Sequence, residues 1–243
     1  MKVLILGSDG YLGWPTAMHF ANNGHQVFAV DNLSKRKIET ELGVGPLNQV
    51  KLFQDRIKIW NKNQKNQINY LVADLLNYKV LCEILSTFKP EIIIHLAAQA
   101  GVRYSLDVPR KYLFSNIIGT FNIIEIAHKI KVKHLLIASS SSVYGANKQS
   151  AFKETDKTDR QLSIYAATKK STENIAHSYS SLWKIPITMM RFFTVYGPWG
   201  RPDMAYFKFT KSIIKNKKID VYNGGEMYRD FTYIDDVTKS IEL

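Results

Sequence analysis

The sequence predicts an α/β fold built around a doubly wound parallel sheet, and two observations carry this prediction. Short apolar runs alternate with helical patterns along most of the chain, an order typical of parallel strands joined by helices. The 243 residues are 45% hydrophobic, which suffices for one substantial core. Strands are expected near residues 2–6, 26–30, 69–73, 91–96, 134–138 and 187–191.

The first predicted strand leads into a turn that is rich in glycine. The apolar residues 3–6 are followed by GSDGYLG at residues 7–13 and then by a helical pattern. Gly7 and Gly10 let the backbone turn and approach a pyrophosphate, and Gly13 permits close contact between helix and strand. Free N–H groups at the start of the helix favour an anion. This segment therefore predicts a Rossmann-type dinucleotide site.

A carboxylate closes the second predicted strand. Asp31 falls where a carboxylate would accept hydrogen bonds from the adenosine ribose hydroxyls of a dinucleotide. Because it would also repel a 2′-phosphate, Asp31 favours NAD over NADP. Lys35 and Arg36 follow closely and could receive such a phosphate, so the sequence leaves NADP open.

A Tyr-x-x-x-Lys step lies on a predicted helix. Tyr165 and Lys169 are four residues apart and therefore share one face of that helix. The Lys169 ammonium can then favour the ionised Tyr165 phenol and turn it into a base near neutral pH. The pattern also occurs on ordinary surface helices. It becomes evidence for a catalytic base because the same chain carries the glycine turn.

Together these residues resemble the extended short-chain dehydrogenase/reductase superfamily and, within it, the NAD-dependent sugar-nucleotide epimerases and dehydratases. The resemblance covers essentially the whole chain and rests on six motifs in the family's order. It implies a Rossmann-type fold with NAD as cofactor. The implied cofactor-binding residues are Gly7, Asp9, Gly10, Tyr11, Leu12, Gly13, Asp31, Asn32, Asp74, Leu75, Leu96, Ala97, Ala98, Gln99, Asn116, Tyr165 and Lys169.

The resemblance also implies a mechanism. Tyr165 as phenolate would remove the proton of the C4 hydroxyl while the C4 hydride passes to the nicotinamide, and Lys169 would lower the tyrosine pKa. Alignment of the serine run selects Ser140 as the residue that hydrogen-bonds the reacting oxygen, with Ser141 as the alternative. Dehydratases carry an Asp-Glu pair next in the chain, whereas this chain has Ser141 and Ser142, which favours epimerisation.

The two halves of the chain resemble different members of the family. Residues 190–205 are similar to UDP-glucuronate 4-epimerases, which implies a UDP-sugar whose C6 carboxylate is held by short hydroxyl donors and a guanidinium. The N-terminal third is similar to UDP-sulfoquinovose synthases, notably Glu41-Leu42-Gly43 and the spacing of Arg56 to Trp60. A third alternative is an NAD-binding protein without catalysis. The implied substrate-binding residues are Arg103, Ser141, Ser142, Thr194, Arg201 and Arg229.

Composition argues against several other functions. The net charge of +12 is spread over small clusters without a recognition motif, so no nucleic-acid partner is expected. The histidines lack paired metal-ligand spacing, which predicts no metal site. No apolar run reaches the about 20 residues of a membrane span, and Met1-Lys2 leads directly into the first strand, so neither membrane insertion nor a signal peptide is expected. The single cysteine, Cys82, fits a cytoplasmic location.

The predicted division of the chain is unequal. Residues 1–191 are expected to form the NAD-binding domain, catalytic residues included, and residues 192–243 the start of a small substrate-binding region. The sequence stops at Ile241-Glu242-Leu243 inside a helical pattern without a C-cap, so we expect a fragment whose substrate region is incomplete. A homodimer is left open.

Overall fold

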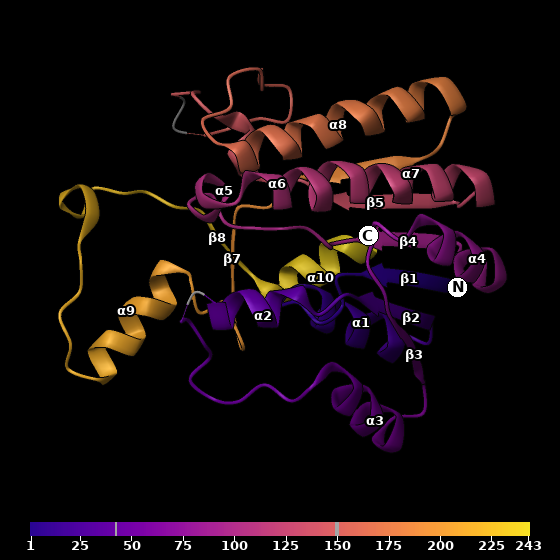
Figure 1. Cartoon of the computed structure of the whole chain (residues 1–243), viewed down its shortest axis with the longest axis horizontal. Helices are drawn as coiled ribbons and strands as arrows, with labels where there is room; N and C mark the ends of the chain where they lie inside the picture. Colours follow the sequence, from indigo (N-terminus) through magenta and orange to yellow (C-terminus); the bar gives the residue numbers. More distant parts are fainter. Residues whose placement is uncertain (42, 149–150) are drawn as a thin grey trace.

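The computed structural model describes residues 1–41, 43–148 and 151–243, so Leu42 of the sulfoquinovose synthase-like segment lies outside the described residues. A six-stranded parallel sheet in the order β3-β2-β1-β4-β5-β6 forms its centre (Figure 1). The predicted fold class is confirmed, and the six predicted strands agree with the structure to within one residue at each end. They are β1 (Lys2–Leu6), β2 (Gln26–Asp31), β3 (Ile68–Val72), β4 (Ile92–His95), β5 (His134–Ala138) and β6 (Ile187–Met190).

Unbroken apolar runs explain the central strands. Val3, Leu4, Ile5 and Leu6 in β1 are all completely buried. Strands of a parallel sheet are covered on both faces, so they lack the apolar–polar alternation of a half-exposed strand. Strand β1 pairs with β2 on one side and with β4 on the other, which places the glycine turn in the middle of the sheet's carboxyl edge.

Two apolar clusters, one on each face of the sheet, form the core. On one face α1 (Gly13–Asn22), α3 (Phe53–Asn63) and α10 (Ile234–Glu242) pack through side chains such as Phe20, Phe53 and Val237. On the other face lie α4 (Tyr78–Phe88), α7 (Gly119–Ile130) and α8 (Ile164–Trp183), which bury Leu81 and Ile123 among others (Figure 1). The topology therefore leaves the carboxyl ends of the strands as the edge on which functional loops gather.

Several shorter elements connect these layers. A π-helical turn, η1, runs directly into α7, and a 3₁₀ turn, η2, follows β5. These two turns carry predicted cofactor and substrate residues. The bounds of the shorter elements are α2 (Ser34–Glu41), α5 (Tyr104–Asp107), α6 (Pro109–Tyr112), η1 (Leu113–Ile118), η2 (Ser141–Tyr144), α9 (Ala205–Ile214) and η3 (Tyr222–Gly225).

The last fifty residues leave the sheet and return to it. Strands β7 (Thr194–Tyr196) and β8 (Phe231–Tyr233) form a separate parallel pair, and α9 with the segment after it extends away from the sheet (Figure 1). Helix α10 then contacts α1 and buries Ile234 and Ile241 in the core. The domain boundary near residue 191 stays a prediction, because the chain beyond it is tied into the sheet domain at its end.

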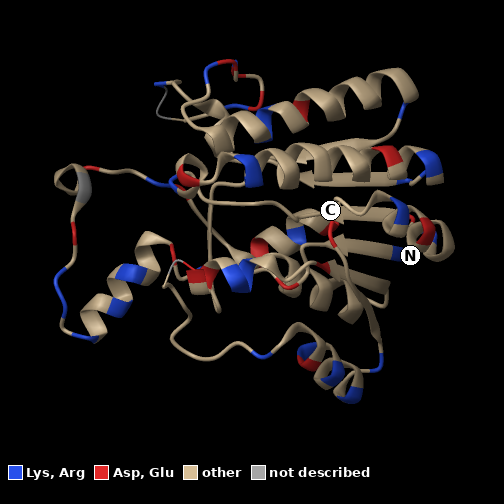
Figure 2. Cartoon of the chain, in the orientation of Figure 1, with Lys and Arg blue, Asp and Glu red and all other residues tan. Residues whose placement is uncertain are grey.

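The charged residues are scattered over separate elements. Figure 2 shows Lys and Arg on α2, α3 and α9 and near the end of α7, with Asp and Glu between them.

Within the described part of the chain, no helix combines the length and the apolarity needed to cross a membrane.

Candidate active site

The glycine turn forms a narrow cradle at the carboxyl end of β1. Gly7 has a φ of 87° and donates its N–H to the Val30 carbonyl at 2.8 Å. A Cβ on Gly7 would lie 2.7 Å from the Ala97 nitrogen, and a Cβ on Gly13 would overlap the Gly7 carbonyl oxygen. Side chains are therefore excluded at both positions, which leaves the backbone bare and close to the N-terminus of α1. This cradle fits the pyrophosphate of a dinucleotide.

The neighbouring residues of the turn extend the cradle. Gly10 donates its N–H to the Gly7 carbonyl at 3.1 Å, and Leu12 stands directly before α1. The Tyr11 hydroxyl is buried beside Gly197 and has no hydrogen-bond partner among the described residues. Burial raises the pKa of this phenol. The turn thus contacts the segment that follows β6 through Tyr11.

Asp31 ends β2 with its carboxylate held in place. Its two oxygens accept the N–H groups of Asp9 at 2.9 Å and Leu33 at 2.7 Å, and burial raises the pKa of the Asp31 carboxyl. The Asn32 amide donates to the Asp74 carboxylate at 2.7 Å and so joins the loops after β2 and β3. This geometry suits an adenosine ribose, because the carboxylate is oriented by backbone groups.

The side-chain amide of Asn116 joins the loop after β4 to η1 and α8 by hydrogen bonds. Asn116 in η1 accepts the Gln99 N–H at 2.8 Å, and its amide nitrogen donates to the Gln99 carbonyl at 3.1 Å and to Thr168 Oγ1 at 3.0 Å. Single π-helical turns within longer helices often occur at functional sites. Here the turn directs Asn116 toward residues 96–99.

The remaining cofactor candidates lie around this loop. The Leu96 N–H donates to the carbonyl of Leu6 at 3.0 Å, and Ala97 closes over Gly7. Ala98 stands between Ala97 and the anchored Gln99. Leu75 is buried against Gly119, where an added Cβ would come within 3.0 Å of it. These residues therefore line the same carboxyl edge of the sheet.

Ser140 and Tyr165 meet beyond the end of β5. Ser140 begins the η2 turn, and its Oγ accepts the Ser142 N–H at 3.2 Å. Tyr165 lies in the first turn of α8, whose N-terminus is capped by Ser163. Burial raises the pKa of the Tyr165 phenol, whereas a hydrogen bond with Ser140 and the positive charge of Arg201 lower it. A serine, a phenol and a guanidinium thus share one site.

Lys169 differs from the expectation that it lowers the tyrosine pKa. Its Nζ donates to the Ala138 carbonyl at 2.8 Å, and complete burial lowers the pKa of Lys169 to about 8. The cation that lowers the pKa of the Tyr165 phenol in this structure is Arg201. The buried ammonium of Lys169 is thus held at the end of β5 by its hydrogen bond to Ala138.

Arg201 is partly buried and already paired. Its Nε lies 3.0 Å and its Nη2 2.5 Å from the two carboxylate oxygens of Asp203, a bidentate arrangement that together with the charge of Asp203 raises the pKa of the guanidinium. Thr194 starts β7 and donates its N–H to the Asp230 carbonyl at 3.1 Å. The guanidinium whose charge acts on Tyr165 is therefore held by an internal carboxylate.

The other candidate substrate-binding residues lie on separate segments of the chain. The Ser141 N–H donates to the Phe192 carbonyl at 2.9 Å, so Ser141 and Ser142 lie beside the segment after β6. Arg103 is exposed immediately before α5. Arg229 is also exposed and donates to the Tyr228 carbonyl at 2.8 Å. Its neighbour Asp230 accepts the N–H of Thr194 at 3.1 Å, so the backbone after Arg229 lies next to the start of β7. Residues 1–41, 43–148 and 151–243 hold no group of three His, Cys, Asp or Glu that could bind an ion.

Comparisons with known proteins agree with this geometry. The model of the NAD dependent epimerase/dehydratase family matches residues 3–242. The chain belongs to this family. It is 46% identical over 241 residues to Protein CapI of Staphylococcus aureus, covering 99% of this chain and 68% of that protein. It is also 46% identical to a protein of Rhizobium meliloti (strain 1021) named "Probable UDP-glucuronate 4-epimerase", covering 99% of this chain and 67% of that protein.

A solved structure is similar over the whole chain. A Tyr-to-Phe mutant of UDP-glucuronic acid 4-epimerase from Bacillus cereus, in complex with a fluorinated UDP-glucuronic acid and NAD, matches with a TM-score of 0.84 at 31% identity. The match covers 100% of this chain and 72% of that one. This family member is therefore an NAD-dependent enzyme with the fold that the sequence predicts, and it spans about two thirds of the length of these relatives.

Sequence reasoning missed the residues that hold the candidates in place. Asp203 pairs with Arg201, and Arg36 and Arg56 both pair with Asp9. An acidic residue two positions after Arg201 was a usable signal for the first pair. The partners of Asp9 carry no such signal, because they come from α2 and α3, far along the chain.

Proposed function

We propose that the protein is an NAD-dependent 4-epimerase that interconverts UDP-glucuronate and UDP-galacturonate. The observation that carries this proposal is the meeting of Tyr165, Ser140 and Arg201, in which a potential base adjoins both a hydroxyl and a guanidinium. The guanidinium matters because a uronate substrate brings a carboxylate that an arginine fork binds well. We further propose that the protein acts in the cytoplasm.

Each side chain has a separate task in this reaction. Tyr165 takes the proton of the C4 hydroxyl, and Ser140 holds the same oxygen by a hydrogen bond. When bound, NAD accepts the hydride from C4 and later returns it. The 4-keto sugar turns over between the two transfers, and Tyr165 then gives its proton back to the oxygen. Burial raises the pKa of the Tyr165 phenol, and the positive charge of Arg201 opposes part of that increase.

Asp203 engages Nε and Nη2 of Arg201 and not Nη1, which supports a uronate substrate. An arginine held by a carboxylate in a bidentate fork is oriented before the substrate arrives. A C6 carboxylate can bind the outer edge of the same guanidinium or replace Asp203 on it. Thr194 adds a short hydroxyl donor from β7. UDP-glucose has no charged group at C6 for these residues to bind.

The contacts of the N-terminal third limit the sulfoquinovose synthase alternative. The Arg56 guanidinium carbon lies 4.6 Å from the centroid of the Trp14 ring, and Arg56 pairs with Asp9. Arg36 pairs with Asp9 as well. Asp9 in turn contacts Asp31, the residue proposed for the adenosine ribose. The likeness in this third therefore concerns the adenosine end of the cofactor. The contacts of Arg56 thus give no reason to prefer a sulfonated sugar.

The residues after Ser140 support epimerisation over elimination of water. Ser141 and Ser142 occupy the positions at which dehydratases carry an acidic pair, and neither is an acid that could protonate C6. The retention of both Tyr165 and Lys169 argues against an NAD-binding protein without catalysis.

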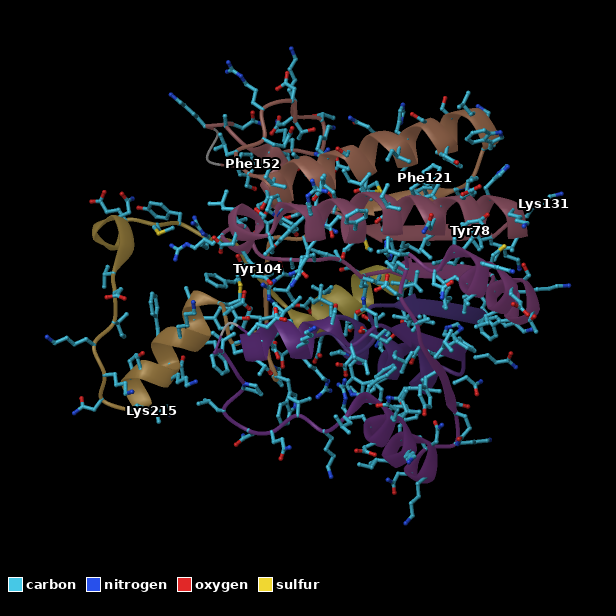
Figure 3. The ribbon with its side chains drawn as sticks, in the orientation of Figure 1. Tyr78, Tyr104, Phe121, Lys131, Phe152 and Lys215 are labelled. Carbon is cyan, nitrogen blue, oxygen red and sulfur yellow. The ribbon has the colours of Figure 1, made fainter. Side chains whose placement is uncertain are left out.

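We also propose a homodimer formed through the exposed face of η1 and α7. Phe114, Ile118 and Phe121 follow one another along this continuous helical segment and are 50%, 45% and 37% exposed. Figure 3 labels Phe121, which lies against Tyr179 of α8 at a ring distance of 6.1 Å. Aromatic side chains gathered on one helical face are typical of an interface between subunits.

Product formation tests the proposed reaction. The full-length protein is incubated with NAD and, separately, with UDP-glucuronate, UDP-glucose, or UDP-glucose and sulfite, and the products are resolved by chromatography. We expect UDP-galacturonate from the first mixture. A sulfonated sugar from the third mixture, with UDP-glucuronate unchanged, would select the sulfoquinovose synthase alternative. NAD binding in calorimetry without turnover of any substrate would select the non-catalytic alternative.

A further inference from the structure

A charged cluster, formed by Asp9, Arg36 and Arg56, joins the glycine turn to the segment after β2. The Asp9 carboxylate accepts Arg36 Nε at 2.6 Å and Arg36 Nη2 at 2.8 Å, and it also pairs with Arg56 Nη2. The Asp9 side chain is only 4% exposed. One nearly buried carboxylate therefore occupies two guanidinium groups.

Both arginines are also held by groups other than Asp9. Arg36 donates to the carbonyls of Val50 at 3.2 Å and Lys51 at 2.8 Å. Arg56 stacks over the Trp14 ring, and its Nε is buried without a partner among the residues that the structure describes. Removal of the Asp9 charge would therefore leave two oriented guanidiniums and one unused N–H.

The cluster adjoins the proposed ribose site. The Asp9 N–H donates to the carboxylate of Asp31 at 2.9 Å, so the two acidic residues are in direct contact. Arg36 follows Asp31 by five positions, at the start of α2. The two carboxylates and the two guanidiniums have no net formal charge together. A 2′-phosphate on the ribose would thus meet two guanidiniums whose charge is already neutralised.

We propose that Asp9 is a specificity-determining residue that makes the protein select NAD over NADP. It does so by occupying the two guanidiniums that would otherwise receive a 2′-phosphate. Two arginines that can each bind a phosphate bidentately form a favourable phosphate site once their own carboxylate is gone. The selection concerns the cofactor alone and does not depend on which sugar the enzyme converts.

Calorimetric titration of the purified chain with NAD and with NADP tests this role. Asp9→Asn keeps the size of the side chain and removes its charge. We expect the ratio of the two dissociation constants to move toward NADP by about tenfold or more, because one unit of positive charge is added beside a doubly charged phosphate. The double variant Asp9→Asn with Arg36→Met should lose most of this gain.

Asp55→Asn provides a matched control. It removes the same charge one position before Arg56, in the first turn of α3, but Asp55 does not pair with either arginine. We expect its ratio of dissociation constants to equal that of the wild type. An equal shift in Asp55→Asn and Asp9→Asn would overturn the proposal, as would an unchanged ratio in Asp9→Asn.

A second variant covers the case in which Asp9→Asn does not fold, as judged by circular dichroism. Arg36→Met leaves Asp9 paired with Arg56 and adds net negative charge near the ribose. Its preference for NAD should therefore widen by about threefold or more. A preference that stays the same or narrows would refute the role of the cluster.

Discussion

At the residue scale, burial and two neighbouring side chains set the pKa of the Tyr165 phenol. Burial raises the pKa of the phenol, and Ser140 and Arg201 lower it. Sequence spacing pointed to Lys169 instead, because residues four apart share a helix face. Spacing on a helix cannot tell which other cation arrives from a distant loop, and Arg201 lies 36 positions after Tyr165 in the chain.

Replacement of Tyr165 by Phe should remove the base without enlarging the site. Turnover of UDP-glucuronate should fall by about 10²–10⁴-fold, the range typical of general acid–base catalysis. NAD affinity, measured by calorimetry, should be nearly unchanged because the ring remains. Near-normal turnover in this variant would contradict the proposed mechanism.

Replacement of Arg201 by Met should weaken the use of UDP-glucuronate far more than any use of UDP-glucose. Loss of a charge-assisted contact costs about 2–3 kcal/mol, or a fall of about 30- to 150-fold in kcat/KM. Since Arg201 lowers the pKa of Tyr165, the variant should also need a higher pH to reach its maximal rate. Equal losses for both sugars would argue that Arg201 does not bind the C6 carboxylate.

Replacement of Lys169 by Met should stabilise the fold near neutral pH. Burial lowers the pKa of Lys169 from 10.5 to about 8, so below pH 8 the folded protein holds a protonated ammonium at a cost. The variant should gain about 1–3 kcal/mol in the free energy of unfolding at pH 7. That gain should shrink as pH rises from 8 toward 10.5, because the penalty in the wild type then disappears. Denaturant titrations at pH 7 and pH 10 measure this difference.

At the element scale, the glycine turn could be predicted from the sequence, whereas the π-helical turn could not. The glycines at positions 7, 10 and 13 are visible in the sequence, and the structure gives each a close backbone neighbour. The η1 turn was not predicted from the sequence. Only the contacts of Asn116 with Gln99 and Thr168 show its purpose.

Replacement of Gly13 by Ala should abolish NAD binding and destabilise the fold. The new Cβ would overlap the Gly7 carbonyl oxygen, so the turn or α1 must move. Such overpacking typically costs about 1–3 kcal/mol. Gly45→Ala is the control, because nothing lies within 4 Å of the Cβ it adds. Thermal unfolding and calorimetry should distinguish the two variants, and equal behaviour would contradict the role of the cradle.

At the scale of the whole molecule, the parallel sheet gathers residues that are far apart in sequence. The turns after β1, β2, β4 and β5 carry Gly7, Asp31, Gln99 and Ser140, and all meet at one edge. Because parallel strands share their direction, their carboxyl ends must lie together. This made the position of the site predictable once the strands were recognised.

The proposed dimer face can be tested at the same scale. Phe114→Asp combined with Phe121→Asp places charges on the exposed face of η1 and α7, so the protein should become monomeric in light scattering. Ile213→Asp is a matched control, because Ile213 on α9 is 67% exposed but lies on another element. NAD affinity should persist in both variants. A wild-type protein that is monomeric at micromolar concentration would refute the proposed dimer.

The sequence by itself determined the apolar runs of the strands, the glycine turn, the carboxylate that closes the second strand and the Tyr165–Lys169 step. These are local patterns, set by the periodicity and conformational needs of neighbouring residues. Only the tertiary structure decided which charges meet. Asp9 takes Arg36 and Arg56, Arg201 takes Asp203 and approaches Tyr165, and Lys169 turns to the end of β5. Ion pairs between distant segments depend on how elements pack, and no local pattern encodes that distance.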